Sequence, residues 1–279
     1  MTLDPEQLGK SKADLAEKLR ELRKRAGLTG DRLAKRCNMS QSTISKIETG
    51  RKTPKLIDVE RILRALDASP DAIAEVAALA RMANTEWQDI RTSWRRGLDK
   101  RQTELASLEV TARDMRYFLP SMITGLLATP EYARASLDYS PGDISKTLAK
   151  KLDRQAVLYD RSRTFTFILT EQAVKWSVIP PAAMSVQIDH LVSVSRLPNV
   201  RLGVIPNGTR ISRGPMNTFT VYDDRLATVE TFTGRIVFQD YRDVAEHLAL
   251  FALYESRATF GETCREHLSR WAEMYRRGL

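Results

Sequence analysis

The sequence has few of the residues that build disulfide frameworks, metal sites and catalytic centres. Its 279 residues include two cysteines and three histidines. Cys37 and Cys264 stand far apart on stretches of helical pattern, so we interpret both as reduced core thiols. His190, His247 and His267 have no metal-ligand spacing with another His, Cys or acid, which indicates structural roles and predicts no metal site.

Sequence motifs of enzymes and of membrane proteins are also missing. No Walker loop, GxSxG nucleophile elbow or dinucleotide fingerprint occurs, so we predict no enzymatic activity and no cofactor. No stretch approaches the roughly 18 consecutive apolar residues of a membrane span. The first residues, MTLDPEQLGKSK, also lack the apolar run of a signal peptide. The sequence therefore predicts a soluble, cytoplasmic protein.

Positive charge is abundant, and one region of the chain holds almost all of the excess. The formal net charge is +9, and residues 10–55 hold 14 Lys and Arg against 5 Asp and Glu. Residues 56–279 are nearly balanced, with 30 basic against 28 acidic groups. This distribution predicts that a polyanion binds to the N-terminal segment.

Residues 29–55 contain a short helix with clear ends. Ser40 is a suitable N-cap, and Gly50 tolerates the positive φ that often follows a helix. In a helix of about ten residues, Ile44 and Ile47 fall on one face and polar residues on the others. A helix this short is unstable alone, so its isoleucines must pack against neighbouring helices.

The preceding residues supply a second helix and a tight turn. Leu33, Ala34 and Cys37 form the apolar face of that helix, and Asn38 suits a left-handed position in the turn. A helix, a short turn and a second helix with a polar start are the parts of a helix-turn-helix. In that motif the first residues of the second helix reach base edges in the DNA major groove.

The side chains that this motif presents to DNA have two expected roles. Polar residues at the start of the second helix contact base edges, and basic residues contact phosphates. The alternative for Gln41 and Ser42 is an ordinary solvated helix start. The predicted DNA-binding residues are Thr29, Arg32, Gln41, Ser42, Thr43, Ser45, Lys46, Arg51 and Lys52.

The run LAKRCNMSQSTISKIETGRKTP resembles the Cro/repressor-like (Xre-type) helix-turn-helix family. One departure from the family pattern concerns the start of the first helix of the motif. The family usually carries a glutamine there, beside the glutamine that opens the second helix, and this chain has Gly30. The resemblance therefore implies that base reading depends more heavily on Gln41 and its neighbours.

The sequence pattern divides the chain into four segments. We expect a flexible arm over residues 1–10, a helix-turn-helix domain over 11–83, a connector helix over 84–103 and a regulatory or partner-binding domain over 104–279. The predicted fold class is mostly α: a five-helix Xre-type helix-turn-helix domain followed by a connector helix and an α+β C-terminal domain.

Two pairs ending in proline mark helix starts in the N-terminal domain. Thr53-Pro54 and Ser69-Pro70 each place proline where it suits the first position of a helix. Beyond them, residues 84–119 fit one long helical stretch with a heptad seam. This seam predicts a coiled-coil dimer contact or a connector whose second half packs into the following domain. Its residues are Trp87, Trp94, Leu98, Leu105, Leu108, Ala112, Met115 and Leu119.

From residue 104 onward the pattern mixes helices and strands. Helices are expected near 104–118, 130–137, 143–162, 182–196, 240–257 and 260–276. Strand-like runs occupy 164–170, 200–206, 217–223 and 226–232. Asp224-Arg225 joins the last two runs, which predicts a hairpin.

This region resembles the domain behind the helix-turn-helix in a large set of WhiJ-like, antitoxin-like actinobacterial regulators. The matching segments include LEVTARDMRYFLPSMITGLLATPEYARASL, QIDHLVSVSRLPNVRLGVIP and GPMNTFTVYDD. The family form Pro-Gly-Leu-Leu-Gln-Thr is replaced by TGLLAT at 124–129, so the proline and the glutamine are missing. If those two residues shape a ligand or partner site, that site is altered here.

We predict a homodimer that binds a palindromic operator in double-stranded DNA. The resemblance implies that a small protein encoded by a neighbouring gene controls the regulator through its C-terminal domain. The residue pattern leaves open a second possibility, a C-terminal domain that senses a small molecule. A toxin-like enzyme fused to a DNA-binding domain is a third possibility, which the lack of a catalytic constellation disfavours.

Four residues of the C-terminal region are candidate ligand or partner contacts. Arg210 and Arg213 lie in the loop NGTRISRGP, where they could receive an acidic group or be solvated in an exposed loop. Glu109 and Glu171 match glutamates of the family pattern and lie among apolar residues. We interpret these two as buried acids that connect helices, or alternatively as part of a binding site.

Overall fold

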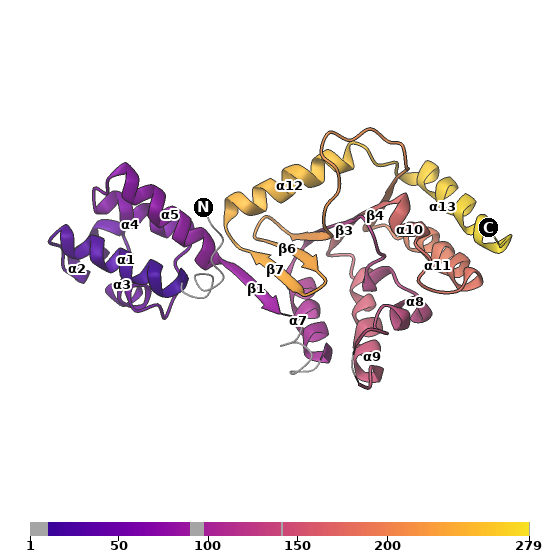
Figure 1. Cartoon of the computed structure of the whole chain (residues 1–279), viewed down its shortest axis with the longest axis horizontal. Helices are drawn as coiled ribbons and strands as arrows, with labels where there is room; N and C mark the ends of the chain where they lie inside the picture. The colour runs from indigo at the N-terminus through magenta and orange to yellow at the C-terminus, as the bar shows by residue number, and fades with distance from the viewer. Residues whose placement is uncertain (1–10, 90–97, 141, 279) are drawn as a thin grey trace. The chain divides into compact units, whose positions relative to one another are not determined.

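The computed structural model describes residues 11–89, 98–140 and 142–278, and the chain divides into two compact units. The N-terminal unit comprises Met1–Glu86 with Phe238–Tyr241, and the C-terminal unit comprises Trp87–Val237 with Arg242–Leu279. Figure 1 labels the helices and strands of the two units.

Helices build the N-terminal unit (Figure 1). Three of them begin at a hydroxyl N-cap, because Thr29, Ser40 and Ser69 each accept a hydrogen bond from a backbone N–H of the first turn. The cap predicted at Ser40 and the helix start predicted at Ser69-Pro70 are thereby confirmed. The helices are α1 (Ser11–Arg25), α2 (Gly30–Cys37), α3 (Gln41–Glu48), α4 (Leu56–Ala65) and α5 (Pro70–Asn84).

A single apolar core joins these helices. Ile44 and Ile47 of α3 are each 1% exposed and pack with buried residues of α1, α2, α4 and α5. Val59 of α4 and Val76 of α5 are 0% exposed. Because α3 has only 8 residues, its stability comes from this burial rather than from helix propensity.

Helix α4 begins later than the Thr53-Pro54 pair predicts. Its first residue is Leu56, and Lys55 occupies the N-cap position without a side-chain cap. Pro54 is buried ahead of the helix, and its carbonyl accepts a hydrogen bond from Asn84 Nδ2 at 3.1 Å. The Pro54 carbonyl is therefore used at the end of α5, and proline does not open α4.

The long helix expected over residues 84–119 is wrong at its N-terminal end. Helix α5 ends at Asn84, and strand β1 (Thr85–Asp89) follows. Asn84 Nδ2 donates to the Ala80 carbonyl at 2.8 Å, and Thr85 Oγ1 donates to the Arg81 carbonyl at 2.9 Å. These side chains satisfy carbonyls of the last turn of α5, which favours a helix end. Residues 90–97, with Trp94 of the expected seam, lie outside the described residues.

The expected helix is also wrong at its C-terminal end. Helix α7 spans Leu98–Thr111, and residues Asp114–Leu119 form strand β2. A strand with both faces covered carries apolar residues without alternation, so its sequence can also fit a heptad. Met115 is 0% and Leu119 2% exposed in the core of the C-terminal unit, so neither is available to a coiled-coil seam.

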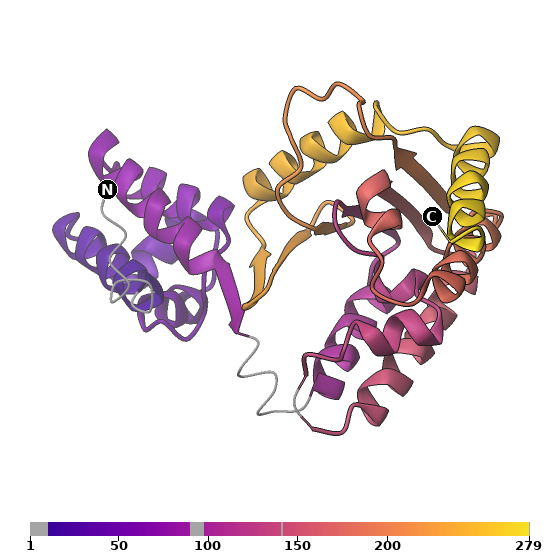
Figure 2. The same cartoon turned by 45° about the vertical axis from the view of Figure 1, so that its right-hand side comes forward.

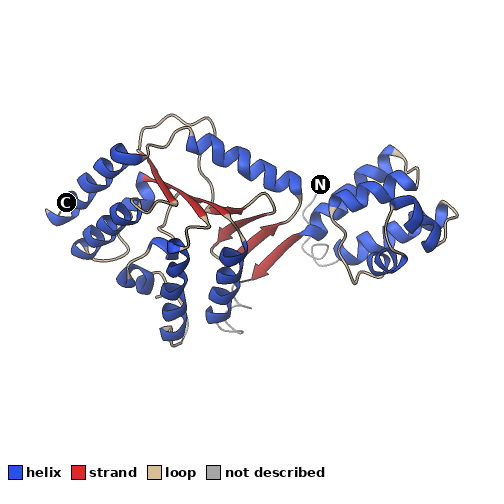
Figure 3. Ribbon diagram, turned by 180° about the vertical axis from the view of Figure 1, so that it is seen from behind, coloured by secondary structure: helices blue, strands red, loops and turns tan. Residues whose placement is uncertain are grey.

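Within the described residues, seven strands form one mixed sheet in the order β1-β7-β6-β5-β2-β3-β4. Figure 3 shows the strands in red. Strands β2, β3 and β4 are parallel, with Met115 opposite Phe165 and Phe165 opposite Val200. Strand β5 pairs antiparallel with β2 and with β6. The four predicted strand runs are confirmed, whereas β1, β2 and β7 were not expected. The further strands are β3 (Thr164–Thr170), β4 (Val200–Ile205), β5 (Phe219–Tyr222), β6 (Leu226–Thr231) and β7 (Gly234–Phe238).

Helices cover both faces of this sheet. On one face Phe118 stacks on Tyr254 of α12 at a ring separation of 3.9 Å. On the other face Phe165 and Phe167 pack in a core with α11 and α13, which lie side by side (Figure 2). The expected helix over 143–162 is divided into α9 and the 3-10 helix η2. The remaining helices are η1 (Gly125–Leu127), α8 (Pro130–Ala135), α9 (Ser145–Asp153), η2 (Arg154–Tyr159), α10 (Glu171–Lys175), α11 (Pro181–Val194), α12 (Tyr241–Glu255) and α13 (Gly261–Arg276).

Candidate nucleic-acid interface

A network of hydroxyl groups fixes the start of α3. Ser40 Oγ accepts a hydrogen bond from the Thr43 backbone N–H at 3.2 Å and lies 2.8 Å from Thr43 Oγ1. It also lies 3.1 Å from Ser42 Oγ. The half-buried Thr43 hydroxyl thus belongs to the cap, whereas Gln41 and Ser42 are exposed beside it.

The remaining polar side chains of α3 point away from the core. Ser45 and Lys46 are exposed, while Ile44 and Ile47 between them are buried. This pattern is the one that the 3.6-residue period of the helix requires. The exposed face of α3 therefore has hydrogen-bonding groups along its length and one positive charge, which suit an approach to base edges and phosphates.

The turn between α2 and α3 depends on a left-handed residue. Asn38 has φ 53° and ψ 48°, and its backbone N–H donates to the Ala34 and Lys35 carbonyls at the end of α2. A short polar side chain tolerates this conformation better than most residues. The conformation predicted for Asn38 is confirmed.

Thr29 and Gly30 bring the start of α2 close to α3. Thr29 Oγ1 accepts a hydrogen bond from the Arg32 backbone N–H at 3.3 Å, so Thr29 caps α2 and exposes Arg32 in its first turn. A Cβ atom at Gly30 would lie 3.8 Å from Gln41 Nε2. A longer side chain at position 30 would therefore contact Gln41. Glycine leaves the space beside the Gln41 amide empty.

The basic residues that follow α3 are also exposed. Gly50 adopts φ 70°, and the Lys52 backbone N–H donates to the Lys46 carbonyl at 3.0 Å, so the chain turns back past the end of α3. Arg51 and Lys52 lie on this turn with exposed side chains. Their distance from the start of α3 along the helix suits contacts to the sugar-phosphate backbone rather than to the same bases.

An ion pair that sequence reasoning missed ties α3 to α1. Arg23 Nε and Nη2 donate to the two carboxylate oxygens of Glu48 at 2.7 and 2.8 Å. Arg23 Nη1 also donates to the Leu28 carbonyl at 2.8 Å. The hydrogen bond to Glu48 raises the pKa of Arg23. In sequence Arg23 is one of several basic residues of α1, and the 25 positions that separate it from Glu48 hide the pairing.

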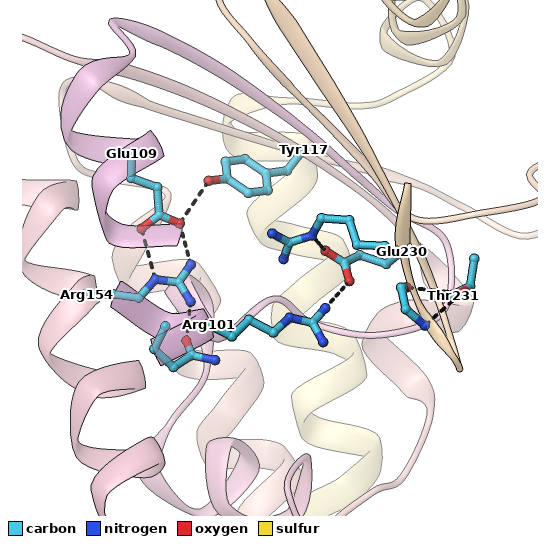
Figure 4. Close-up of polar contacts among 9 residues, drawn as sticks. Arg101, Glu109, Tyr117, Arg154, Glu230 and Thr231 are labelled. Atoms are coloured by element: carbon cyan, nitrogen blue, oxygen red, sulfur yellow. Dashed lines mark hydrogen bonds and ion pairs between the residues drawn. The ribbon is translucent and has the colours of Figure 1, made fainter. Parts of the chain in front are cut away.

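The candidate contacts of the C-terminal unit do not form one site among the described residues. Glu109 is 1% exposed and accepts hydrogen bonds from Arg154 and Tyr117 (Figure 4). Glu171 accepts hydrogen bonds from the Asn207 backbone N–H at 2.9 Å and from Lys175 at 3.0 Å. The two glutamates therefore connect different elements and use their oxygens within the unit.

The environment of Glu171 explains its ionisation. Burial alone raises the pKa of this carboxyl, but hydrogen bonds from Asn207 and Lys175 and the charge of Lys175 hold the pKa below the ordinary value.

The loop that carries the two candidate arginines begins at Asn207, whose backbone N–H donates to Glu171. Arg210 and Arg213 are exposed, and Arg213 lies 3.8 Å from Glu246 of α12.

The part of the chain that the structure describes contains no group of three or more His, Cys, Asp and Glu side chains that could hold a metal ion. The buried thiols Cys37 and Cys264 both have a raised pKa because of burial, to about 12 for Cys264. Thiols of this kind are poor nucleophiles. Within the described residues, no helix combines the length and the apolar character that crossing a membrane requires.

Comparisons with known proteins match two separate segments of the chain. A helix-turn-helix domain matches residues 14–88. A domain of unknown function, DUF5753, matches residues 102–270, which is more than half of the chain. An uncharacterised HTH-type transcriptional regulator of Methanothermobacter thermautotrophicus is 48% identical over 48 residues, covering 17% of this chain and 70% of that protein.

Similarity to solved structures is weak. The phospholipase D family member Nuc of Salmonella typhimurium has 7% identity and a TM-score of 0.35, covering 57% of this chain and 90% of its own. The archaeal chromatin protein TrmBL2 has 12% identity and a TM-score of 0.34, covering 72% of this chain and 64% of its own. TM-scores this low support no argument about function.

Proposed function

Because the chain belongs to the family of the DUF5753 domain and carries an N-terminal helix-turn-helix domain, we propose that it is a sequence-specific DNA-binding transcriptional regulator. The observation that supports this most directly is the construction of α3. Two buried isoleucines and the Arg23–Glu48 pair hold the helix, and the Ser40 cap orders its first turn. Gln41 and Ser42 are left exposed at the end that enters the major groove in this motif.

In this mechanism the exposed residues divide the work of recognition. Gln41 can form two hydrogen bonds to adenine, and Ser42 and Ser45 can donate to base acceptors or contact a thymine methyl group. Thr43 acts mainly through the cap. Phosphates are neutralised by the cationic side chains of Arg32, Lys46, Arg51 and Lys52. Thr29 holds the start of α2 against the sugar-phosphate backbone of the DNA. Each neutralised phosphate steepens the dependence of log K on log salt by about 0.9.

The regulator acts as a homodimer on a palindromic operator, with half-sites about one helical turn or a multiple of it apart. The C-terminal region, residues 104–279, receives the regulatory signal, as in the antitoxin-like regulators that the sequence resembles. In the preferred form the signal is a small protein encoded by a neighbouring gene. In the alternative form the signal is a small molecule bound to the C-terminal unit.

Selection of bound DNA from a random pool by the full-length protein tests the DNA-binding proposal. A palindromic motif is expected, and mass of the complex by light scattering should correspond to two chains per site. No enriched sequence would refute sequence-specific binding, and one chain per site would refute the dimer. Mass spectrometry of proteins co-purified from the native host distinguishes the two forms of the signal.

Two matched variants test the residue roles. Gln41→Ala should weaken binding to the selected site by about 1 to 3 kcal/mol and relax the base preference there. Arg51→Ala should weaken all sequences equally and reduce the salt slope by about 1. Equal losses on every sequence from both variants would remove Gln41 from base reading.

A further inference from the structure

Cationic side chains converge beneath the sheet of the C-terminal unit. Arg101 of α7 points to Glu230 of β6, and Arg154 of η2 points to Glu109 of α7 (Figure 4). Lys151 of α9 is close enough to Arg101 and Arg154 for both charges to act on its ammonium group. Arg235 of β7 donates to the same Glu230 at 2.6 Å.

The carboxylates in this cluster do not balance the cations. Glu109 pairs with Arg154 through a hydrogen bond of 3.0 Å from Nε, and Gln102 accepts a further bond from the same guanidinium. Glu230 alone serves both Arg101 and Arg235. Glu104 is also close enough to Arg101 for its charge to act on the guanidinium. Four cations thus face three carboxylates among the described residues, which leaves one positive charge in excess. An excess of charge away from bulk water is unfavourable unless an anion compensates it.

Lys151 is the cation with the fewest partners. Among the described residues its ammonium donates only to Ser136 Oγ, which itself donates to the Ala133 carbonyl. Burial and the positive charges of Arg154 and Arg101 lower the pKa of Lys151 to about 8. Two of its three N–H groups therefore lack an acceptor within the part of the chain that is described.

A hydroxyl group in the turns that follow α8 also lacks a partner among the described residues. Ser140 Oγ is buried without a hydrogen bond, and it lies four positions beyond Ser136, the acceptor of Lys151. Its neighbour Tyr139 is close enough to Arg101 to act on its charge. Arg101 and Lys151 are partly exposed, so a small solute can reach them from water.

We propose that the C-terminal unit binds a compact oxyanion, a phosphate or a carboxylate, between Arg101, Lys151 and Arg154. A negative charge offsets the excess positive charge of the cluster. The anion accepts hydrogen bonds from the free N–H groups of Lys151 and from the guanidinium edges of the arginines. The inference rests on the proposed function, whose small-molecule form it deepens by giving a site and a ligand class.

Glycine at position 125 is part of this site. A Cβ atom there would lie 2.6 Å from Lys151 Cε and 3.1 Å from its Cγ, so glycine allows Lys151 to cross η1. Gly125→Ala would displace the lysine without changing any charge. This substitution therefore tests whether anion binding depends on where the Lys151 ammonium group lies, because the charge itself is kept.

Isothermal titration of the full-length protein with inorganic phosphate, pyrophosphate and succinate, at constant ionic strength set by chloride, tests the site. The wild-type protein is expected to bind at least one of them saturably. Lys151→Gln should weaken that binding at least tenfold. Lys150→Gln, the matched control whose lysine is bonded to Asp99 at 2.9 Å, should change it less than twofold. Binding of the phosphates alone identifies a phosphate ligand, and binding of succinate alone identifies a carboxylate ligand.

Absence of saturable binding of all three anions, or equal losses in the two lysine variants, would overturn the inference. If Lys151→Gln does not fold, Gly125→Ala replaces it, and unchanged anion affinity in that variant would overturn the inference equally. DNA selection on the same preparations separates the two proposals. An enriched DNA site without anion binding refutes only the anion site. Lysine-dependent anion binding without an enriched DNA site refutes only the DNA-binding proposal.

Discussion

Loss of the Arg23–Glu48 pair should loosen α3 before it affects the rest of the chain. Arg23→Ala removes two hydrogen bonds to Glu48, at 2.7 and 2.8 Å, and one to the Leu28 carbonyl at 2.8 Å. The Glu48 carboxylate then stays at the end of α3 without its partner. Since α3 has 8 residues, little else resists its opening.

The size of the effect follows from burial of the pair. The side chains of Arg23 and Glu48 are 15% and 10% exposed. Breaking a buried ion pair by removing one partner costs about 3 to 5 kcal/mol, because the remaining charge stays poorly hydrated. Partial exposure lets some water reach Glu48, so the lower end of that range, about 3 kcal/mol, applies here.

Hydrogen exchange of the α2 and α3 amides in the full-length protein measures this local stability. Where exchange reports the opening equilibrium, about 3 kcal/mol raises the rate on the order of 100-fold. Arg25→Ala is the matched control on the same helix. Its pair with Glu21 is 68% and 43% exposed, so the expected loss is about 0.5 kcal/mol or less.

Similar exchange rates in the two arginine variants would refute the assignment of Arg23 as the anchor of α3. A double replacement tests the cause. Arg23→Met with Glu48→Leu removes both charges and should restore protection to within about 1 kcal/mol of the wild type, because no charge remains buried. If the double variant still lost protection from hydrogen exchange, the stability of α3 would depend on the geometry of the hydrogen bonds rather than on an unpaired charge.

Three further predictions concern the Ser40 cap, the space beside Gln41 of α3 and Lys151. Ser40→Ala should cost about 1 kcal/mol of protection in α3, whereas Ser42→Ala should cost little; equal effects would remove the cap from the argument. Gly30→Gln should place an amide against Gln41 and narrow the base preference that selection reports, and an unchanged motif would refute the contact. Lys151 has a pKa of about 8 in the folded protein against an ordinary 10.5, so the unfolded chain binds its proton more tightly. Stability of the wild type relative to Lys151→Gln should therefore rise from about pH 8 to about pH 10.5 in urea titrations at several pH values, and a flat difference would contradict the lowered pKa.

Local sequence signals located α3 correctly. The Ser40 cap, the buried pair Ile44 and Ile47 and the left-handed Asn38 are all confirmed, because each depends on a few neighbouring residues. Strand β3 is likewise found at residues 164–170 as predicted. Its β-branched and aromatic residues suit a strand whatever its neighbours are.

Signals that depend on distant residues were misjudged or missed. The apolar residues of β2 fitted a helical heptad, and only the pairing of both edges of this segment with β3 and β5 shows that it is a strand inside the sheet. Glu109 was recognised as a buried acid, but its partner Arg154 lies 45 positions away and could not be identified. Such pairings have no periodicity in the sequence, so no local pattern indicates them.

The sequence by itself determined where this protein concentrates positive charge, where its short helices begin and which polar side chains stand at the start of α3. These properties follow from local backbone preferences and helical periodicity. Only the tertiary structure decided that Arg23 holds Glu48, that Gly30 leaves space beside Gln41 and that four cations meet three carboxylates under the sheet. Electrostatic balance and close packing depend on which distant residues become neighbours, and folding alone settles that.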